Sequence, residues 1–341
     1  MKKNIFTVAM LVLVAVFFAL MWGVAQRYLG QGKDLNRAAW ESSYSERKVK
    51  LPESGPRDGY WGSRRGNAVE DRHTVWRDAE VHVPGLLEVD ASGYQYFRSP
   101  MPARIRIVIL GASVASGAYA SAIDNTYFSI LGTELQRMGL PADIVVIASG
   151  AWKSTQELSA LGHYLQGVKP DLVIFLNGLN DLTGGATARH LYGEPFQSPN
   201  GEIADPLYHT HDYRQRVSTY IGNMAAAREL VAARGARMLV VLQPSLNERS
   251  GRTVIEEKVL KASLVPHESS KALSNSYVEI RGELLRLEKS GGMDFLDCSQ
   301  VFDRERETTF ADLWHFSDFG HRVLGGVLAD RISAILKNGN K

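Results

Sequence analysis

The sequence predicts an α/β protein whose main domain is a doubly wound parallel sheet flanked by helices, preceded by an N-terminal transmembrane helix. Short runs rich in Ile, Val and Leu alternate with segments of helical periodicity from residue 101 onward. Such alternation is typical of parallel sheets with helices on both faces, whose strands are apolar on both sides. One apolar span, 5–25, lies outside this alternation. Its length is that of a membrane-crossing helix.

The span 5–25 carries no charge and follows Lys2 and Lys3. About 20 apolar residues cross a bilayer core of about 30 Å. A cleaved signal peptide is the alternative, with residues 23–25 as its small-residue cleavage site. Cleaved signals usually have shorter apolar cores, of about 7–15 residues. We therefore expect residues 1–26 to be an uncleaved single-pass anchor in the inner (cytoplasmic) membrane.

The orientation of this anchor does not follow from charge, because basic residues stand on both sides of the span. The tail before the span is very short, and such tails usually stay inside the cell. We therefore expect the domain after the anchor to lie outside the cytoplasm, in the periplasm.

Composition limits the classes of function. The chain has 341 residues, of which 45% are hydrophobic and 22% charged, and its net charge is +2. This is enough for one large domain with an appendage, and the balanced charge does not favour a nucleic-acid partner. The single cysteine, Cys298, excludes an internal disulfide and ends an apolar run. We expect it to be buried for packing rather than reactive.

Residues 27–100 are polar and interrupted by Gly and Pro, but they contain Trp40, Trp61 and Trp76. The tryptophans argue against a fully disordered segment. We interpret 27–100 as a membrane-proximal stalk that packs partly on the main domain, 101–341.

The elements of the main domain follow in order along the chain. Residues 104–110 form an apolar run that predicts the first buried strand. The later runs and periodic segments predict, in turn, a helix over 127–138, a strand over 143–149, a helix over 158–165, a strand over 171–177, a helix over 213–234, strands over 237–244 and 293–299, and a closing amphipathic helix over 323–335.

Two insertions interrupt the alternation, at 183–211 and 245–270. Both follow strand ends, so we expect them to form walls or a lid of a pocket. His190, His209 and His211 lie in the first insertion. No cysteine or closely spaced carboxylate set accompanies them, so we predict no metal site and no cofactor.

Four short segments carry groups suited to acyl transfer. Ser113 follows the first strand between Gly111 and Gly117, and Gly150 follows the second. Asn180, with Asp181 beside it, follows the third, and Asp312 stands three residues before His315. A serine nucleophile needs a base and a group that orients that base. It also needs donors for the oxygen that becomes negative. The candidates for nucleophile, base and orienting group are Ser113, His315 and Asp312. The candidates for the oxyanion donors are the amides of Ser113 and Gly150 and the Asn180 side chain.

Each segment alone has a structural alternative. The sequence NGLND can be a turn with Asp181 as a helix cap, and Asp312 with His315 can be a surface pair. Gly150 can be an ordinary glycine at a strand end. Their joint occurrence, with three of the four directly after strands of one sheet, favours the catalytic interpretation.

In these four segments the chain resembles the SGNH (GDSL-type) hydrolases. The matching blocks are GASVASG with Ser113, ASG with Gly150, GLND with Gly178 and Asn180, and DLWH with Asp312 and His315. The resemblance covers about residues 104–336. It implies a flavodoxin-like three-layer sandwich and a serine esterase with a Ser113–His315–Asp312 triad. It also implies an oxyanion hole formed by Ser113, Gly150 and Asn180.

The chain departs from the family pattern at two positions. Ala112 stands where the family name has Asp, and Ala148 where Asn is frequent. Neither position is nucleophile, base or oxyanion donor, so these changes bear on substrate range. The run from Gly150 through NGLNDL also resembles members associated with bacterial capsule and exopolysaccharide production.

The sequence does not fix the roles of three further ring side chains near these blocks. His321 lies six residues after His315, and we expect it to be a capping or surface histidine on the closing helix. Trp152 and Trp314 adjoin the oxyanion glycine and the Asp–His pair. Such rings either stack on sugars or only exclude water.

The function expected from these features is a membrane-anchored, metal-independent serine esterase. Its expected substrate is an O-acyl, notably O-acetyl, ester on a cell-surface or exported polysaccharide, or another small ester. An acyltransferase, a lipid or thioester hydrolase, and a non-catalytic glycan-binding scaffold remain the alternatives. Retention of Ser113, Asn180, Asp312 and His315 argues against the scaffold.

Overall fold

The computed structural model describes residues 68–166, 168–183, 213–262 and 267–338. Its centre is a six-stranded sheet in the order β10-β9-β8-β6-β7-β5. Five strands are parallel, and β5 runs antiparallel to β7 at the edge. The parallel strands are β6 (Ile105–Gly111), β7 (Ala142–Ala148), β8 (Leu172–Asn177), β9 (Arg237–Leu242) and β10 (Asp294–Asp297).

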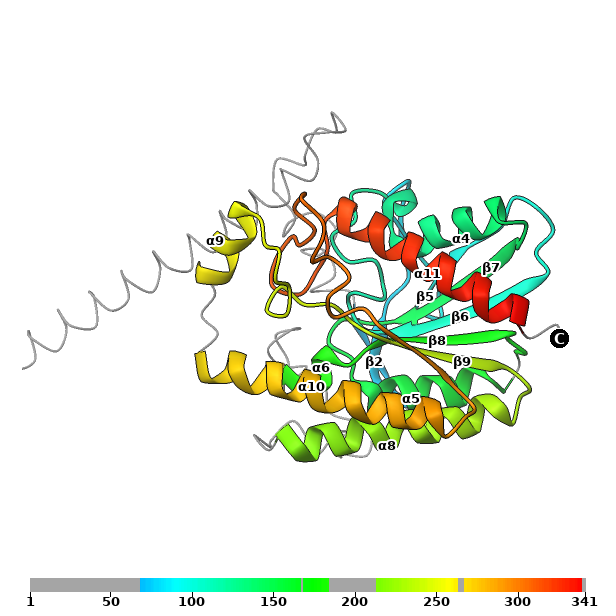
Figure 1. The fold of residues 1–341 in the computed structure, drawn as a ribbon. Helices are drawn as coiled ribbons and strands as arrows, with labels where there is room; N and C mark the ends of the chain where they lie inside the picture. The colour runs from blue at the N-terminus through cyan, green and yellow to red at the C-terminus, as the bar shows by residue number, and fades with distance from the viewer. Residues whose placement is uncertain (1–67, 167, 184–212, 263–266, 339–341) are drawn as a thin grey trace, which may run out of the picture.

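Helices cover both faces of the sheet, as Figure 1 shows. Helices α4 (Tyr127–Arg137) and α11 (Asp318–Asn338) cover one face. Helices α5 (Ser154–Tyr164), α8 (Tyr213–Ala232) and α10 (His267–Lys289) cover the other. The expected doubly wound sheet is therefore confirmed.

The strand sequences explain why both faces are covered. Ile107 and Ile109 of β6 pack in the core under α4 and α11. Their neighbours Val108 and Leu110 pack in the core under α5, α8 and α10. Because successive strand residues point to opposite faces, a continuous apolar run requires two cores.

Two parts of the fold differ from the sequence-based elements. The strand β5 (Tyr94–Phe97) pairs with β7, so the sheet includes residues that the sequence analysis assigned to the stalk. Ahead of it, the strands β1 (Ala68–Asp71) and β2 (Val75–Asp78) form one hairpin, and β3 (Val81–Val83) and β4 (Leu87–Val89) form another. These four strands are too short to show a clear alternating pattern.

The second difference is α10, which begins within the predicted insertion 245–270. Its buried residues Leu273, Tyr277, Ile280 and Leu284 are spaced three or four apart, a helical signal that the sequence analysis did not use. The remaining short helices are η1 (Ile123–Asn125), α6 (Leu179–Thr183) and α9 (Val254–Ala262).

Several predictions fall outside the described residues. They are the anchor 1–26, Trp40, Trp61, and the three histidines of the first insertion. Within the described ranges, no helix combines the length and apolar character needed to cross a membrane. Cys298 is described and fully buried, as expected.

Candidate active site

Ser113 lies just past the carboxyl end of β6, the strand at which the order of the sheet reverses. Gly111 at the end of β6 pairs with Ala148 on one side and Leu176 on the other. A Cβ on Gly111 would lie 2.4 Å from the Leu176 carbonyl oxygen, so only glycine allows the strands this close. Doubly wound sheets bind ligands at such a reversal point. The three segments that follow β6, β7 and β8 therefore meet at one edge of the sheet.

The structure brings Ser113 and His315 together across 202 residues of sequence. The His315 Nε2 atom lies 2.9 Å from the Ser113 hydroxyl oxygen. The His315 Nδ1 atom lies 2.8 Å from Asp312 Oδ2. This is the connected arrangement of nucleophile, base and orienting carboxylate that serine acyl transfer needs.

The local turn fixes Asp312 against the His315 ring. Asp312 Oδ1 accepts hydrogen bonds from the backbone N–H groups of Trp314 and His315, both at 2.8 Å. Burial raises the pKa of the Asp312 carboxyl, but the charge and hydrogen bonds of His315 and the Trp314 amide outweigh it and lower the pKa below its usual value. Asp312 is therefore ionised at neutral pH and can orient the base.

A buried ion pair stabilises the loop that leads to Asp312. Arg249 and Glu256 form this pair and are both almost fully buried. Glu256 Oε1 also accepts from the backbone N–H groups of Thr309 and Phe310, at 2.9 and 3.1 Å. The described part of the second insertion thus supports the loop before Asp312. Sequence reasoning missed this role, because the contact joins segments about 50 residues apart.

Tyr119 stacks on the imidazole of His315, the predicted base. Its ring centroid lies 4.9 Å from that of His315, with the planes at 21°. Tyr119 has φ 68°, a left-handed conformation that is uncommon for a residue other than glycine. No local sequence pattern marks this residue, since its role depends on a distant histidine.

His321 is not the capping or surface residue that the sequence suggested. It lies on α11, as expected, but it is fully buried, and its Nε2 lies 2.9 Å from the Ala118 carbonyl oxygen, to which it donates. Burial lowers the pKa of His321 to about 4. It is therefore neutral at pH 7 and stabilises the chain segment after Ser113.

A second residue of α11 supports the same segment. Asp318 accepts from the Ser121 backbone N–H at 2.9 Å and from the Ser121 hydroxyl at 2.5 Å. The first turn of α11 therefore anchors the chain on both sides of Tyr119. The prediction of the helix over 323–335 started it one turn late, and so left this turn out.

Two buried tryptophans fix the turn that contains Gly150. The indole N–H of Trp76, on β2, donates to the Gly150 carbonyl at 3.0 Å. The indole N–H of Trp152 donates to the Trp76 carbonyl at 2.8 Å. Between Gly150 and Trp152, Ala151 has φ 63°, which costs an L residue roughly 1–2 kcal/mol. The tryptophan contacts therefore hold a strained backbone at the predicted oxyanion donor.

Asn180 lies on α6, just after β8, and contacts the same turn. Its side-chain Nδ2 donates to the Trp152 carbonyl at 2.9 Å, which brings the two predicted donors Gly150 and Asn180 into one cluster. Gly178, just before, has φ 102°, and a Cβ there would lie 2.8 Å from a Leu242 methyl carbon. The turn therefore requires glycine at this position.

Asp181 has the capping role that was the alternative for NGLND. Its Oδ1 accepts from the Ser154 backbone N–H at 3.2 Å and from the Ser154 hydroxyl at 2.5 Å, at the start of α5. The segment thus contains a structural residue and a predicted catalytic residue side by side. The capping interpretation applies to Asp181, and the catalytic interpretation of Asn180 stays a prediction.

No cluster of three or more His, Cys, Asp or Glu side chains suited to a metal ion occurs within the described ranges.

Comparison with known proteins gives resemblances to solved structures. A lipase/acylhydrolase from Enterococcus faecalis is 17% identical, with a TM-score of 0.43, covering 67% of this chain and 96% of that one. An acetylxylan esterase from Geobacillus stearothermophilus is 14% identical, with a TM-score of 0.41, covering 68% and 95%. A GDSL-like lipase from Bacteroides thetaiotaomicron is 13% identical, with a TM-score of 0.41, covering 70% and 93%.

No family model and no curated protein matches the chain. At these identities and TM-scores the resemblance assigns no activity by itself. The geometry of Ser113, His315 and Asp312 carries the functional conclusion.

Proposed function

We propose that this protein is a serine esterase of the SGNH type that hydrolyses O-acyl esters, notably O-acetyl esters of an exported or cell-surface polysaccharide. The observation that carries the proposal is the connected hydrogen-bond chain from Ser113 Oγ through His315 to Asp312, at 2.9 and 2.8 Å. A binding scaffold has no need for this alignment of three side chains from two distant segments.

In the proposed reaction, the Ser113 hydroxyl attacks the ester carbonyl carbon and His315 Nε2 takes its proton. Asp312 stabilises the imidazolium that forms, and Tyr119 lies against its ring. The amides of Ser113 and Gly150 and the Asn180 side chain donate to the negative oxygen. The proton returns from His315 to the leaving alcohol, which departs. Water then attacks the acyl-serine carbonyl carbon and gives a proton to His315. His315 passes this proton to Ser113 Oγ as the bond between the acyl carbon and Oγ breaks, which releases the acid and restores Ser113.

The choice of a glycan ester rests on two sequence features: the resemblance to exopolysaccharide-associated members and the predicted anchor 1–26. With the anchor, the catalytic domain would face exported polymers. The half-buried Trp314, beside the Asp–His pair, offers an aromatic surface for a sugar ring.

The activity is tested with the purified full chain. We expect it to release acetate from acetylated oligosaccharides and from 4-nitrophenyl acetate, and to be labelled by a fluorophosphonate probe. Ser113→Ala should lose turnover and labelling while remaining folded. Acyl transfer to a sugar hydroxyl without acetate release would assign an acyltransferase instead. No turnover and no labelling of the folded wild type would refute the proposal.

Membrane attachment is tested separately. The full chain should remain in the membrane fraction after carbonate washing, and protease added to the periplasmic face should degrade the catalytic domain. A soluble mature protein that begins near residue 26 would show that 5–25 is a cleaved signal.

A further inference from the structure

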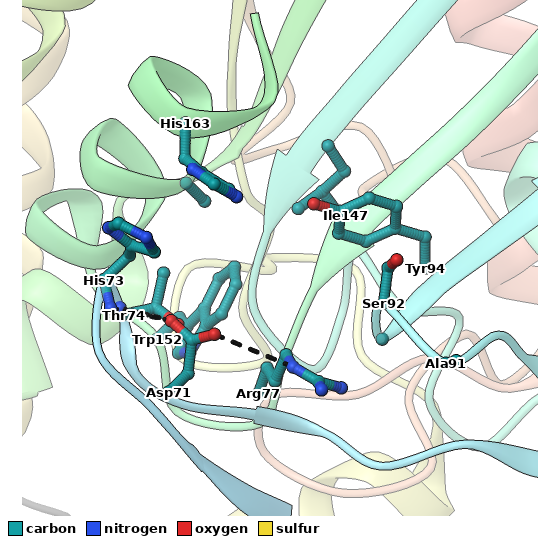
Figure 2. A pocket seen from close by; sticks show the side chains of 12 residues that line it. Asp71, His73, Thr74, Arg77, Ala91, Ser92, Tyr94, Ile147, Trp152 and His163 are labelled. Atoms are coloured by element: carbon teal, nitrogen blue, oxygen red, sulfur yellow. Dashed lines mark hydrogen bonds and ion pairs between the residues drawn. The ribbon is translucent and has the colours of Figure 1, made fainter. Parts of the chain in front are cut away.

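A cavity of about 210 Å³ lies beside the candidate active site (Figure 2). It is bounded by the β1–β2 hairpin, the turn before β5, and helix α5. Of the described residues that line it, none is a triad or oxyanion residue. The side chain of Trp152 lines the cavity, and the carbonyl of the same residue accepts a hydrogen bond from Asn180. Trp152 thus contacts both the cavity and Asn180, a predicted oxyanion donor.

The cavity has an apolar floor and a polar surround. Ile147, Ala160 and Trp152 supply the floor. Figure 2 shows the imidazole rings of His73 and His163 on one side and the side chains of Tyr94 and Ser92 across from them. Asp71 and Arg77 lie between these two sides. The two imidazoles are stacked, with centroids 4.2 Å apart.

Several of these polar groups lack a partner in the protein. Within the described ranges, the Ser92 hydroxyl, the Tyr94 hydroxyl and the His163 ring make no hydrogen bond. Burial raises the pKa of Tyr94 to about 12, so its hydroxyl keeps its proton and can donate. Ser92 and His163 are exposed, and Tyr94 is half-buried. A half-buried hydroxyl without a protein partner favours a ligand that accepts its hydrogen bond.

The charges in the cavity favour a neutral ligand. Asp71 Oδ2 lies 3.7 Å from Arg77 Nε, so one negative and one positive charge offset each other. An anion would meet the Asp71 carboxylate, and a cation would meet Arg77. Donors and acceptors are both present, which suits neighbouring hydroxyl groups that each donate and accept.

The size of the cavity limits the ligand to about one ring. Pockets for drug-sized ligands measure about 300–1,000 Å³, and this one is smaller, at about 210 Å³. An apolar floor under a polar surround matches the C–H face and the hydroxyl edge of a sugar ring.

We propose that this cavity is a subsite for one neutral sugar unit of the glycan whose ester Ser113 would hydrolyse. The inference rests on the proposed function for its place in catalysis. The subsite is formed largely by residues 71–94, so the segment between the predicted anchor and the catalytic domain would contribute to substrate selection.

The kinetic test uses the full chain and the double variant Ser92→Ala/Tyr94→Phe, which removes two hydroxyls and keeps the shape of the cavity. We expect its KM for acetylated xylo-oligosaccharides to rise about tenfold, the effect of losing two hydrogen bonds. Turnover of 4-nitrophenyl acetate should stay within about twofold, because this small ester has no sugar unit. Tyr164→Phe is the matched control: Tyr164 contacts the Tyr94 ring edge-on but does not line the cavity, and neither KM should change. An unchanged oligosaccharide KM, or an equal change for both substrates, would overturn the subsite and leave the esterase intact.

A binding test separates the subsite from the activity and decides the matter if these oligosaccharides are not turned over. Wild type and the double variant are titrated calorimetrically with unacetylated xylo-, cello- and chito-oligosaccharides, with an oligogalacturonate and with inorganic phosphate. Binding of a neutral oligosaccharide by wild type that is weakened in the double variant supports the subsite. Three results would overturn the subsite. Wild type could bind only the oligogalacturonate or phosphate, it could bind no probe, or both proteins could bind a neutral oligosaccharide equally well.

Discussion

The burial of His321 makes the stability of the fold depend on pH. Burial lowers the pKa of this imidazole to about 4, although the hydrogen bond to Ala118 and the charge of Asp318 act in the opposite direction. In the unfolded chain the pKa of a histidine is about 6.5. Between these two values the unfolded chain binds a proton that the folded protein excludes. The free energy of unfolding should therefore be highest above about pH 6.5 and fall as the pH is lowered toward about 4.

The size of this effect follows from the pKa difference. A difference of about 2.5 units at 1.36 kcal/mol per unit corresponds to roughly 3 kcal/mol. This is a large part of the stability of a typical domain, about 5–15 kcal/mol. The part of the chain that loses support is the segment after Ser113, because His321 donates to the Ala118 carbonyl.

The variant His321→Gln tests this prediction, since glutamine can still donate a hydrogen bond but does not titrate. Urea denaturation of both proteins at about pH 7 and about pH 4 should show wild type losing about 3 kcal/mol more than the variant. His82→Gln is the control. His82 is exposed, and its hydrogen bonds to the Glu80 and Glu88 carboxylates raise its pKa, so its titration changes the stability in the opposite direction. An equal acid-induced loss in wild type and His321→Gln would refute the reasoning.

Three further predictions concern the residues around the triad. Asn180→Ala should lower kcat about 10²–10³-fold with little change in KM, because an oxyanion donor acts mainly in the transition state. A kcat near the wild-type value would contradict this role for Asn180. Unfolding of the variant, seen by circular dichroism, would show that the turn is purely structural. Trp76→Phe removes the hydrogen bond to the Gly150 carbonyl. Because such a bond contributes about 1 kcal/mol, we expect kcat to fall several-fold. An unchanged kcat in steady-state assays, with only the melting temperature lowered, would limit Trp76 to stability. Glu256→Gln leaves Arg249 buried without its counter-charge and should cost about 3–5 kcal/mol in urea denaturation; a loss below about 1 kcal/mol would show that the pair contributes little.

Local pattern accounts for the architecture. The apolar runs of β6, β7, β8 and β9 alternate with helical periods, and this alternation is compatible with few folds other than a doubly wound sheet. The short strands β1 to β5 and the full length of α10 did not follow as readily. Short strands carry too little periodicity, and β5 is defined by its pairing with β7.

The candidate triad could also be named in advance, because Ser113, Asp312 and His315 lie in short motifs with fixed spacing at strand and turn positions. The structure then shows that they are in contact. Sequence could not reveal Tyr119, which stacks on a histidine almost 200 residues away.

Sequence pattern therefore determined which residues form the parallel strands and which side chains are candidates for acyl transfer, since both depend on chemistry within a few neighbouring positions. Only the tertiary structure decided that Trp76 supports Gly150, that Glu256 supports the Asp312 loop, and that His321 is buried and neutral. Each of these roles depends on a contact between segments distant in sequence. Hydrogen bonding and burial at such contacts are set by packing, which local periodicity does not encode.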